Sequence, residues 1–255
     1  MNLDDVLVVN FATGERTVAL SEYCIKKLGF KNVVSIQSDD GFYGKFLEFA
    51  KIAANSDAQC FLRTDADRLL FSGTIDLVQK WFDDKSLKCV EGRCFDFLMN
   101  KYRGATPHLF SRQAMDELNN DHSLIPDSQK PESRFIENIT EDKKRGWVGI
   151  DTVTNLHDYE QHPAKVCNTI INRISRGHFH YLYDPRHVAT LPPPYVKAFL
   201  HAQAYVSEHG EKTKMDYIDF PDELFDVPGY EFGPILEEDI TGLYEKHLAV
   251  YNSLS

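Results

Sequence analysis

The sequence predicts an α/β fold in which a mainly parallel central sheet, Rossmann-like in its order, is flanked by helices. In the first part of the chain, apolar runs typical of buried strands alternate with segments that have helical spacing. Strand–helix–strand connections of this kind are right-handed and place their strands in parallel. The last part of the chain is expected to add a mostly helical C-terminal extension that packs on the core.

Three strands, each followed by a helix, carry this prediction. In order, they are expected at Val6–Val9 and 17–28, at Val33–Ile36 and 42–54, and at Ala58–Thr64 and 74–82. Val6–Val9 is an unbroken run of apolar residues, mostly β-branched, as found in strands that are buried on both faces. Gly29 marks the end of the first helix, since glycine adopts the left-handed conformation that commonly stops helices.

Later elements are less regular. They are expected at 88–102 as a strand or hairpin, 108–110 as a strand, 111–118 as a helix capped by Ser111, 147–156 as a strand, and 159–176, 195–208 and 238–254 as helices. The stretch 119–132 is typical of a loop. We expect a catalytic core over 1–160, with a nucleotide-sugar half at about 1–100 and an acceptor half at about 101–160, and the extension over 161–255.

Composition and charge narrow the class of protein. Of the 255 residues 42% are hydrophobic, and 28 Lys+Arg against 39 Asp+Glu give a formal net charge of -11. This charge disfavours nonspecific binding to nucleic acid or to an anionic membrane, and it favours a cation as partner. No apolar run approaches the roughly 20 residues that cross a bilayer, and the acidic start of the chain differs from a signal peptide. We therefore expect a cytoplasmic protein.

The five cysteines include no CxxC pair. Neither a disulfide framework nor a zinc ribbon is therefore expected, and the thiols are predicted to be reduced and mostly buried.

The acidic triplet Asp65-Ala66-Asp67 is the clearest candidate for a metal site. Its carboxylates directly follow an expected buried strand, at the edge of the sheet where ligands of α/β folds bind. Mg²⁺ and Mn²⁺ prefer oxygen ligands and are often shared between carboxylates and a diphosphate. Aspartate is also frequent in solvated turns, and two aspartates one residue apart arise often by chance. The position after the third strand favours the metal site.

A longer pattern surrounds the triplet: Val33–Ile36 leading to Asp39-Asp40, a helix with Gly44 and Lys45, and then Phe61–Asp67. Over roughly residues 5–160 this pattern resembles glycosyltransferases of the GT-A type, closest to family 2-like enzymes. The resemblance implies that Asp65 and Asp67 form the DxD pair that holds Mn²⁺ or Mg²⁺. It also implies a nucleotide-sugar donor, with a UDP-sugar favoured. The nucleotide contacts that it implies are Asn10, Ala12, Arg16, Asp39, Lys45, Arg63, Asp65 and Ala66.

The same resemblance implies a catalytic carboxylate further along the chain. Pro131–Phe135 and Arg145-Gly146-Trp147 resemble the family segment in which an acidic pair precedes a helix ending in a Gly–aromatic step. An inverting transferase needs a carboxylate there to accept the proton of the attacking hydroxyl. Glu132 is the first candidate and Glu137 the second, although the family often has Glu-Asp where this chain has Glu132-Ser133. A charge run such as 137–145 is also typical of a solvated helix face.

Histidines supply further candidates. His157 follows the expected strand 147–156, where the resemblance implies a third metal ligand; capping of the next helix is the alternative. His178 and His180 alternate, so on a strand they would face the same side and could share a metal ion. The alternatives are exposed or core-edge histidines and a loop that contacts the acceptor or the diphosphate.

The sequence therefore predicts a metal-dependent glycosyltransferase that acts on a saccharide or glycoconjugate acceptor. One alternative is a sugar-nucleotide nucleotidyltransferase, but its first turn carries a glycine-rich basic phosphate loop, and 10–16 has a single glycine and no lysine. The other is a noncatalytic sugar- or nucleotide-binding module of the same fold, which would turn over no donor.

Overall fold

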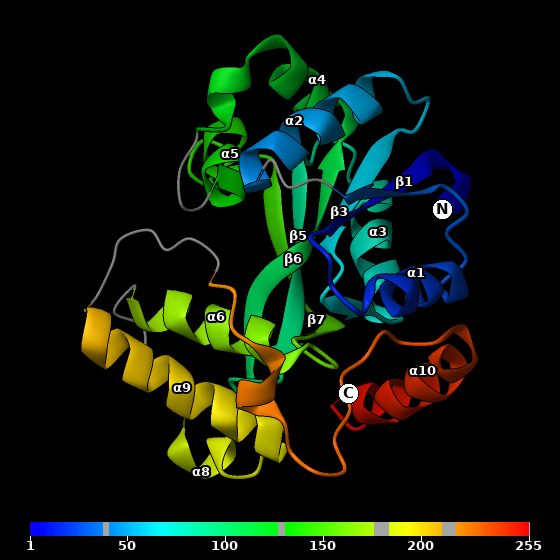
Figure 1. The fold of residues 1–255 in the computed structure, drawn as a ribbon. Helices are drawn as coiled ribbons and strands as arrows, with labels where there is room; N and C mark the ends of the chain where they lie inside the picture. Colours follow the sequence, from blue (N-terminus) through cyan, green and yellow to red (C-terminus); the bar gives the residue numbers. More distant parts are fainter. Residues whose placement is uncertain (38–40, 127–130, 176–183, 211–217, 255) are drawn as a thin grey trace. The chain divides into compact units, whose positions relative to one another are not determined.

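The computed structural model describes residues 1–37, 41–126, 131–175, 184–210 and 218–254 (Figure 1). The chain divides into two compact units: Met1–Phe95 with Tyr102–His157 and Ile235–Ser255, and Asp96–Lys101 with Asp158–Pro234. The first unit contains most of the sheet and confirms the α/β fold. The break between the units follows His157, and Ile235–Ser255 belongs to the first unit; the expected division at residue 160 stays a prediction.

Seven strands form one sheet in the described part of the chain, in the order β2-β1-β3-β6-β5-β7-β4. Their bounds are β1 Val6–Ala12, β2 Val33–Gln37, β3 Cys60–Asp65, β4 Arg68–Leu70, β5 Cys89–Asp96, β6 Lys101–Ser111 and β7 Trp147–His157. β1 is parallel to both β2 and β3, as the strand–helix alternation predicts. β6 joins β3 and β4 joins β7 in antiparallel pairs, so the sheet becomes mixed beyond its three N-terminal strands.

Helices cover both faces of this sheet. In the first unit they are α1 Val18–Lys27, α2 Gly41–Ala54, α3 Gly73–Asp83, α4 Arg112–Asn120, α5 Pro131–Ile139 and α10 Glu237–Asn252. Ser111 caps α4 as predicted, because its Oγ accepts a hydrogen bond from the Ala114 N–H at 3.2 Å. The stretch expected to be a loop contains the short 3-10 helix His122–Leu124 and the start of α5.

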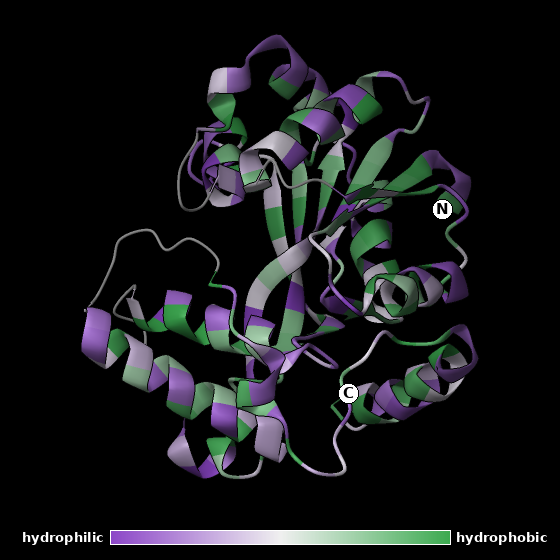
Figure 2. Cartoon of the chain, in the orientation of Figure 1, coloured by the Kyte–Doolittle hydropathy of each residue, from purple (hydrophilic) through white to green (hydrophobic). Residues whose placement is uncertain are grey.

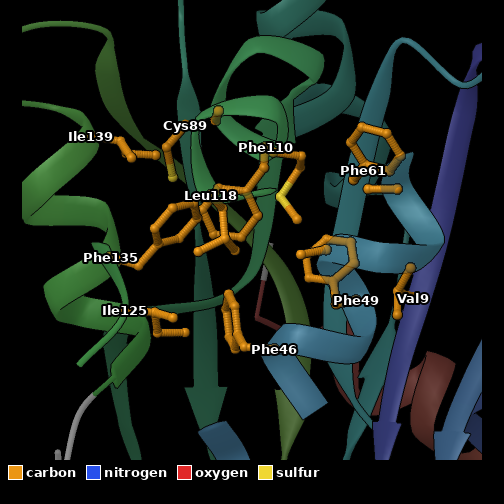
Figure 3. Packing of buried hydrophobic residues seen from close by; sticks show 14 of the residues in the cluster. Val9, Phe46, Phe49, Phe61, Cys89, Phe110, Leu118, Ile125, Phe135 and Ile139 are labelled. Carbon is orange, nitrogen blue, oxygen red and sulfur yellow. The ribbon is translucent and has the colours of Figure 1, made fainter. Parts of the chain in front are cut away.

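Strand β1 lies in the middle of the core, and all seven of its residues are buried. Successive side chains alternate between the faces of a sheet, so Val9 packs in the cluster that includes α2 and α5, while Val8 packs with residues of α1 and α3. Phe46 and Phe49 of α2 fill the first cluster (Figure 3). In Figure 2 the strands are largely hydrophobic and the helices alternate hydrophobic with hydrophilic residues, as expected for helices with one buried face.

The C-terminal helix α10 is held by Tyr251. The Tyr251 hydroxyl accepts from the Gly73 N–H at 3.0 Å and donates to the Val153 carbonyl at 2.8 Å, and its ring stacks on Phe71. Gly73 also permits the close approach of β7 to the start of α3, because a Cβ there would lie 2.0 Å from the Val153 oxygen. The last helix therefore completes the first unit.

The second unit is mostly helical. It comprises α6 Pro163–Ser175, α8 Pro185–Val188, α9 Pro193–His209 and the 3-10 helix Asp222–Phe225. α6 begins at Pro163, where a missing N–H costs the helix nothing. Arg173 of α6 lies 3.3 Å from a carboxylate oxygen of Asp96 and 3.1 Å from one of Asp158. These ion pairs join the two chain segments that make up the second unit.

All five cysteines are buried and unpaired, as expected. Burial raises the pKa of the thiols of Cys24, Cys60 and Cys167 to about 12. Among the described residues, no helix is both long enough and apolar enough to span a bilayer.

Candidate functional site

The acidic triplet lies at the carboxyl end of β3, at the edge of the sheet that the sequence predicts. Asp65 is the last residue of β3 and pairs with Phe11 of β1. The Ala66 N–H donates to the Phe11 carbonyl at 2.9 Å, and Asp67 then turns the chain into β4. The backbone of the triplet is thus tied to the buried strand β1.

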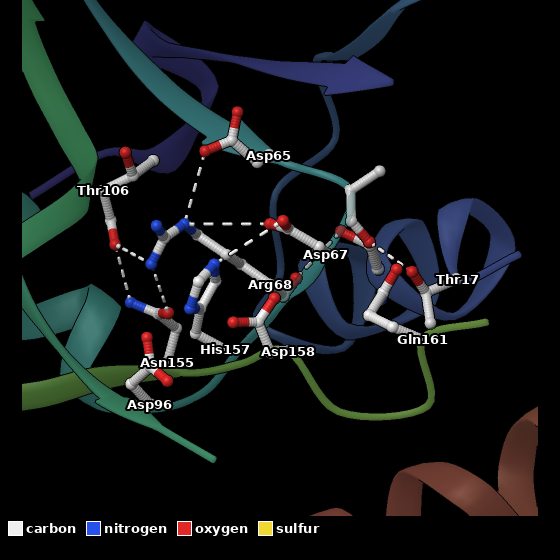
Figure 4. A network of polar contacts seen from close by, with 12 residues as sticks. Thr17, Asp65, Asp67, Arg68, Asp96, Thr106, Asn155, His157, Asp158 and Gln161 are labelled. Atoms are coloured by element: carbon white, nitrogen blue, oxygen red, sulfur yellow. Dashed lines mark hydrogen bonds and ion pairs between the residues drawn. The ribbon is translucent and has the colours of Figure 1, made fainter. Parts of the chain in front are cut away.

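The short strand β4 brings Asp67 to His157. β4 pairs with the end of β7 so that Arg68 lies opposite His157. The Asp67 Oδ2 and His157 Nε2 atoms are 3.5 Å apart, and both side chains are largely buried (Figure 4). Two atoms that share an ion with bonds of about 2.1 Å lie about 3 Å apart in octahedral geometry. This carboxylate–imidazole pair therefore fits a divalent metal ion.

The ring of His157 is oriented by Arg103, whose Nη2 lies 3.0 Å from the His157 Nδ1. A guanidinium can only donate, so Nδ1 accepts and Nε2 carries the ring proton, facing Asp67. For a metal ion to bind Nε2, the ring proton has to move from Nε2 to Nδ1. A protonated Nδ1 no longer accepts the hydrogen bond from Arg103. Metal binding at His157 would therefore break the hydrogen bond from Arg103 to Nδ1.

Asp65 is held by arginines. Its carboxylate pairs with the Arg63 Nη2 and, at 3.3 Å, with the Arg68 Nε. Burial raises the pKa of Asp65 and the nearby Asp67 carboxylate adds to this effect, while the two arginines oppose it. The structure thus brings two of the three predicted metal ligands together and holds the third in ion pairs; metal ligation by Asp65 stays a prediction.

Arg63 is the centre of a second buried network. Its side chain is 1% exposed, and its Nη1 donates to both carboxylate oxygens of Glu132 at 3.0 Å each and to the Thr106 hydroxyl at 2.6 Å. The guanidinium also lies 4.6 Å above the Phe11 ring and 4.8 Å above that of Phe42. This position explains why an arginine is tolerated in a core strand.

Glu132 lies in the first turn of α5, and its carboxylate contacts Arg63 and His108. The His108 Nδ1 lies 2.8 Å from the Glu132 Oε1. Burial alone would raise the pKa of Glu132, but the charges of Arg63 and His108 outweigh it and lower the pKa to about 2. Glu132 is therefore ionised throughout the physiological range.

This shift predicts a pH-dependent contribution to stability. The pKa of Glu132 is lowered from its ordinary 4.5 to about 2, so folding gains roughly 3 kcal/mol from this group above pH 4.5 and loses it as the pH falls toward 2. We expect the difference in unfolding free energy between wild type and Glu132→Gln to be largest at pH 7 and to shrink at pH 3, as measured by urea denaturation. Glu117→Gln is the control, since its pair with Lys88 is only half-buried; a constant difference for Glu132→Gln would contradict the shift.

A cavity of about 450 Å³ adjoins these networks. Its charged lining comprises the cations Arg63, Arg68, Arg103 and Lys143 and the carboxylates Asp65, Glu91 and Glu132. Lys143 Nζ pairs with Glu91 at 2.7 Å, and the Trp147 Nε1 approaches the same carboxylate at 3.3 Å. Donors and acceptors are thus present in similar numbers, which suits a polar, hydroxylated ligand.

Residues predicted at the end of the first strand lie in different surroundings. Asn10 and Ala12 have no exposed surface, and Arg16 is half-buried. Lys45 of α2 is buried and donates to the Ala12 carbonyl and the Thr13 hydroxyl, so it ties α2 to the turn after β1. Ala66 is also fully buried. Their contacts with a nucleotide stay predictions.

The remaining predicted residues do not line the cavity or lie outside the residues that the structure describes. Glu137 pairs with the exposed Arg134 at 2.6 Å and does not line the cavity. Asp39, His178 and His180 lie outside the residues that the structure describes.

The residues at the site that were not singled out from the sequence include Arg68, Arg103 and His108. Arg68 directly follows the triplet, so its position next to two carboxylates would have allowed the sequence to predict it as a site residue. Arg103 and His108 lie on the long strand β6, and only the sheet order brings that strand beside β3.

Comparisons with known proteins found no family model that matches and no match among curated proteins. Among solved structures, A197 from STIV matches with a TM-score of 0.46 and 10% identity, over 60% of this chain and 84% of that one. A glycosyltransferase involved in glycosylation of the major capsid of PBCV-1 matches with a TM-score of 0.41 and 9% identity, over 60% and 91%. A cytidylyltransferase from Leptospira borgpetersenii matches with a TM-score of 0.38 and 9% identity, over 84% and 99%. At TM-scores below 0.5, none of these matches supports an assignment of family or activity.

Proposed function

We propose that this chain is a divalent-metal-dependent glycosyltransferase, which moves a sugar from a nucleotide-diphosphate donor, a UDP-sugar being favoured, to a saccharide or glycoconjugate hydroxyl. The observation that carries the proposal is the Asp67–His157 pair, 3.5 Å apart at the carboxyl end of β3. Next to it lies a polar cavity of about 450 Å³. Ligands of α/β sheets bind at this edge.

In this proposal Asp67 and His157 hold Mn²⁺ or Mg²⁺, with Asp65 as a further ligand when the arginines release it. When bound, the metal ion neutralises the diphosphate that leaves as the sugar is transferred. The residue that follows His157 in the sequence, Asp158, is a further carboxylate.

In this proposal Arg103 binds the diphosphate of the donor. It lines the cavity, and metal binding at His157 would free its guanidinium from the Nδ1 atom. A planar guanidinium matches the oxygens of a phosphate with two parallel hydrogen bonds. Occupation of the metal site would thus prepare a phosphate-binding cation next to it.

Glu132 is favoured over Glu137 as the base that accepts the proton of the attacking hydroxyl, because Glu132 lines the cavity and Glu137 does not. The low pKa of Glu132 keeps it ionised but makes it a weak proton acceptor. The contribution of this carboxylate is therefore expected at the low end for a general base, about 100-fold.

A panel of donors tests the proposal. Wild-type protein is incubated with UDP-, GDP-, CMP- and dTDP-sugars, with Mn²⁺ or with chelator, and separately with nucleoside triphosphate and sugar phosphate. We expect Mn²⁺-dependent release of a nucleoside diphosphate from one donor. Pyrophosphate release from a triphosphate would instead identify a nucleotidyltransferase, and no turnover of any donor would leave a binding module.

A further inference from the structure

Thr17 occupies the N-cap position of α1 but does not cap the helix. An N-cap threonine usually accepts a hydrogen bond from a backbone N–H of its own first turn. Here the Thr17 side chain makes no such bond, and its Oγ1 donates instead to the carbonyl of Ala66 at 2.7 Å. Thr17 is fully buried, so water does not reach this contact. The Thr17 hydroxyl therefore binds the backbone of the acidic triplet and does not cap its own helix.

Ser21 does the same one turn later. Its hydroxyl donates to the Arg68 carbonyl at 3.1 Å, although a serine inside a helix usually bonds a carbonyl of the preceding turn or faces solvent. Residues four apart lie on one face of a helix. Thr17 and Ser21 therefore present two buried hydroxyls from one face of α1 to the same loop.

Three hydrogen bonds thus fix the backbone on both sides of Asp67. The Ala66 N–H binds Phe11 in β1, the Ala66 carbonyl accepts from Thr17, and the Arg68 carbonyl accepts from Ser21. The Ala66 carbonyl belongs to the peptide group that joins Ala66 to Asp67, so its orientation limits the backbone rotation of Asp67 and the direction of its side chain. Figure 4 shows Thr17 beside this loop and Asp67 directed toward His157.

We propose that Thr17 and Ser21 are positioning residues of the metal site, which aim the Asp67 carboxylate at the point between it and His157 where the ion binds. The inference rests on the proposed function, since it requires that this pair holds a metal ion. Groups that orient a metal ligand without touching the ion typically change affinity 10- to 100-fold when they are removed. The hydroxyl of Thr17 is expected to have an effect of that size.

The test is Mn²⁺ affinity, measured by electron paramagnetic resonance of free Mn²⁺, for Thr17→Val, Thr17→Ser and wild type. Thr17→Val keeps the shape but loses the donor, and we expect its Kd to rise about 10- to 100-fold. Thr17→Ser restores the hydroxyl and is expected to return to the wild-type Kd. Ser21→Ala, a smaller change, is expected to raise the Kd in the same direction and serves if Thr17→Val does not fold.

Thr74→Val is the matched control. Thr74 is a buried threonine whose hydroxyl donates to the Thr154 carbonyl of β7 at 2.9 Å, and not to the acidic triplet. It is expected to lose stability without a change in Kd. Wild-type Kd values in Thr17→Val or Ser21→Ala, or an equal rise in Thr74→Val, overturn the inference alone. A wild-type protein that binds no Mn²⁺ overturns the proposed metal site and this inference with it.

Discussion

Replacing Arg63 by methionine is expected to lower the free energy of unfolding by about 3 to 5 kcal/mol. Arg63 is 1% exposed, and it neutralises both Glu132 and Asp65 in the interior. Methionine fills similar space but removes the guanidinium and leaves the Glu132 carboxylate in contact with His108. Removal of one partner of a buried ion pair leaves an uncompensated charge. Chemical denaturation of both proteins at pH 7 measures the loss.

A second substitution identifies the cause of this loss. In Arg63→Met/Glu132→Gln the buried carboxylate is removed together with its partner, so part of the stability is expected to return. Arg134→Met is the surface control, because Arg134 is 63% exposed and its pair with Glu137 contributes at most about 1 kcal/mol. Equal small losses in Arg63→Met and Arg134→Met would show that the buried network does not stabilise the fold.

Asp67→Asn is expected to lower metal-dependent donor cleavage at least about 100-fold, since groups that only orient metal ligands already contribute 10- to 100-fold. The amide keeps the size of the side chain and one oxygen but removes the charge that faces His157 at 3.5 Å. Product formation at several Mn²⁺ concentrations measures the effect. Higher Mn²⁺ is expected to restore part of the rate if the loss comes from weaker metal binding.

Asp76→Asn is the matched control for this variant. Asp76 lies exposed on α3, so the same chemical change there is expected to leave both the rate and the Mn²⁺ dependence at wild-type values. A fully active Asp67→Asn enzyme would refute the role of this carboxylate.

The parallel part of the fold was predictable because its strands carry local signals. The apolar run in β1 is buried on both faces, and the helices that follow it have regular spacing. The antiparallel part was not predictable in the same way. β4 has only three residues, Arg68–Leu70, too few to show a period, and its partner β7 comes from far along the chain.

In the candidate site, too, some features were predictable from the sequence and others were not. Asp65 and Asp67 lie at the predicted sheet edge, since their position depends only on where β3 ends. The sequence did not reveal that Asp65 would pair with Arg63 and Arg68, because those contacts depend on which side chains turn inward. The helix 238–254 was expected to pack on the core, but the contact that holds it was not predictable, since a tyrosine hydroxyl at position 251 carries no signal that it meets Gly73.

Crystals of the wild-type protein soaked in Mn²⁺ test the central claim most directly, through the anomalous scattering of the ion. We expect a single strong peak bonded to the Asp67 carboxylate and to the His157 Nε2, with the Arg103 guanidinium withdrawn from Nδ1. A peak elsewhere, or none between these two side chains at saturating Mn²⁺, would contradict it.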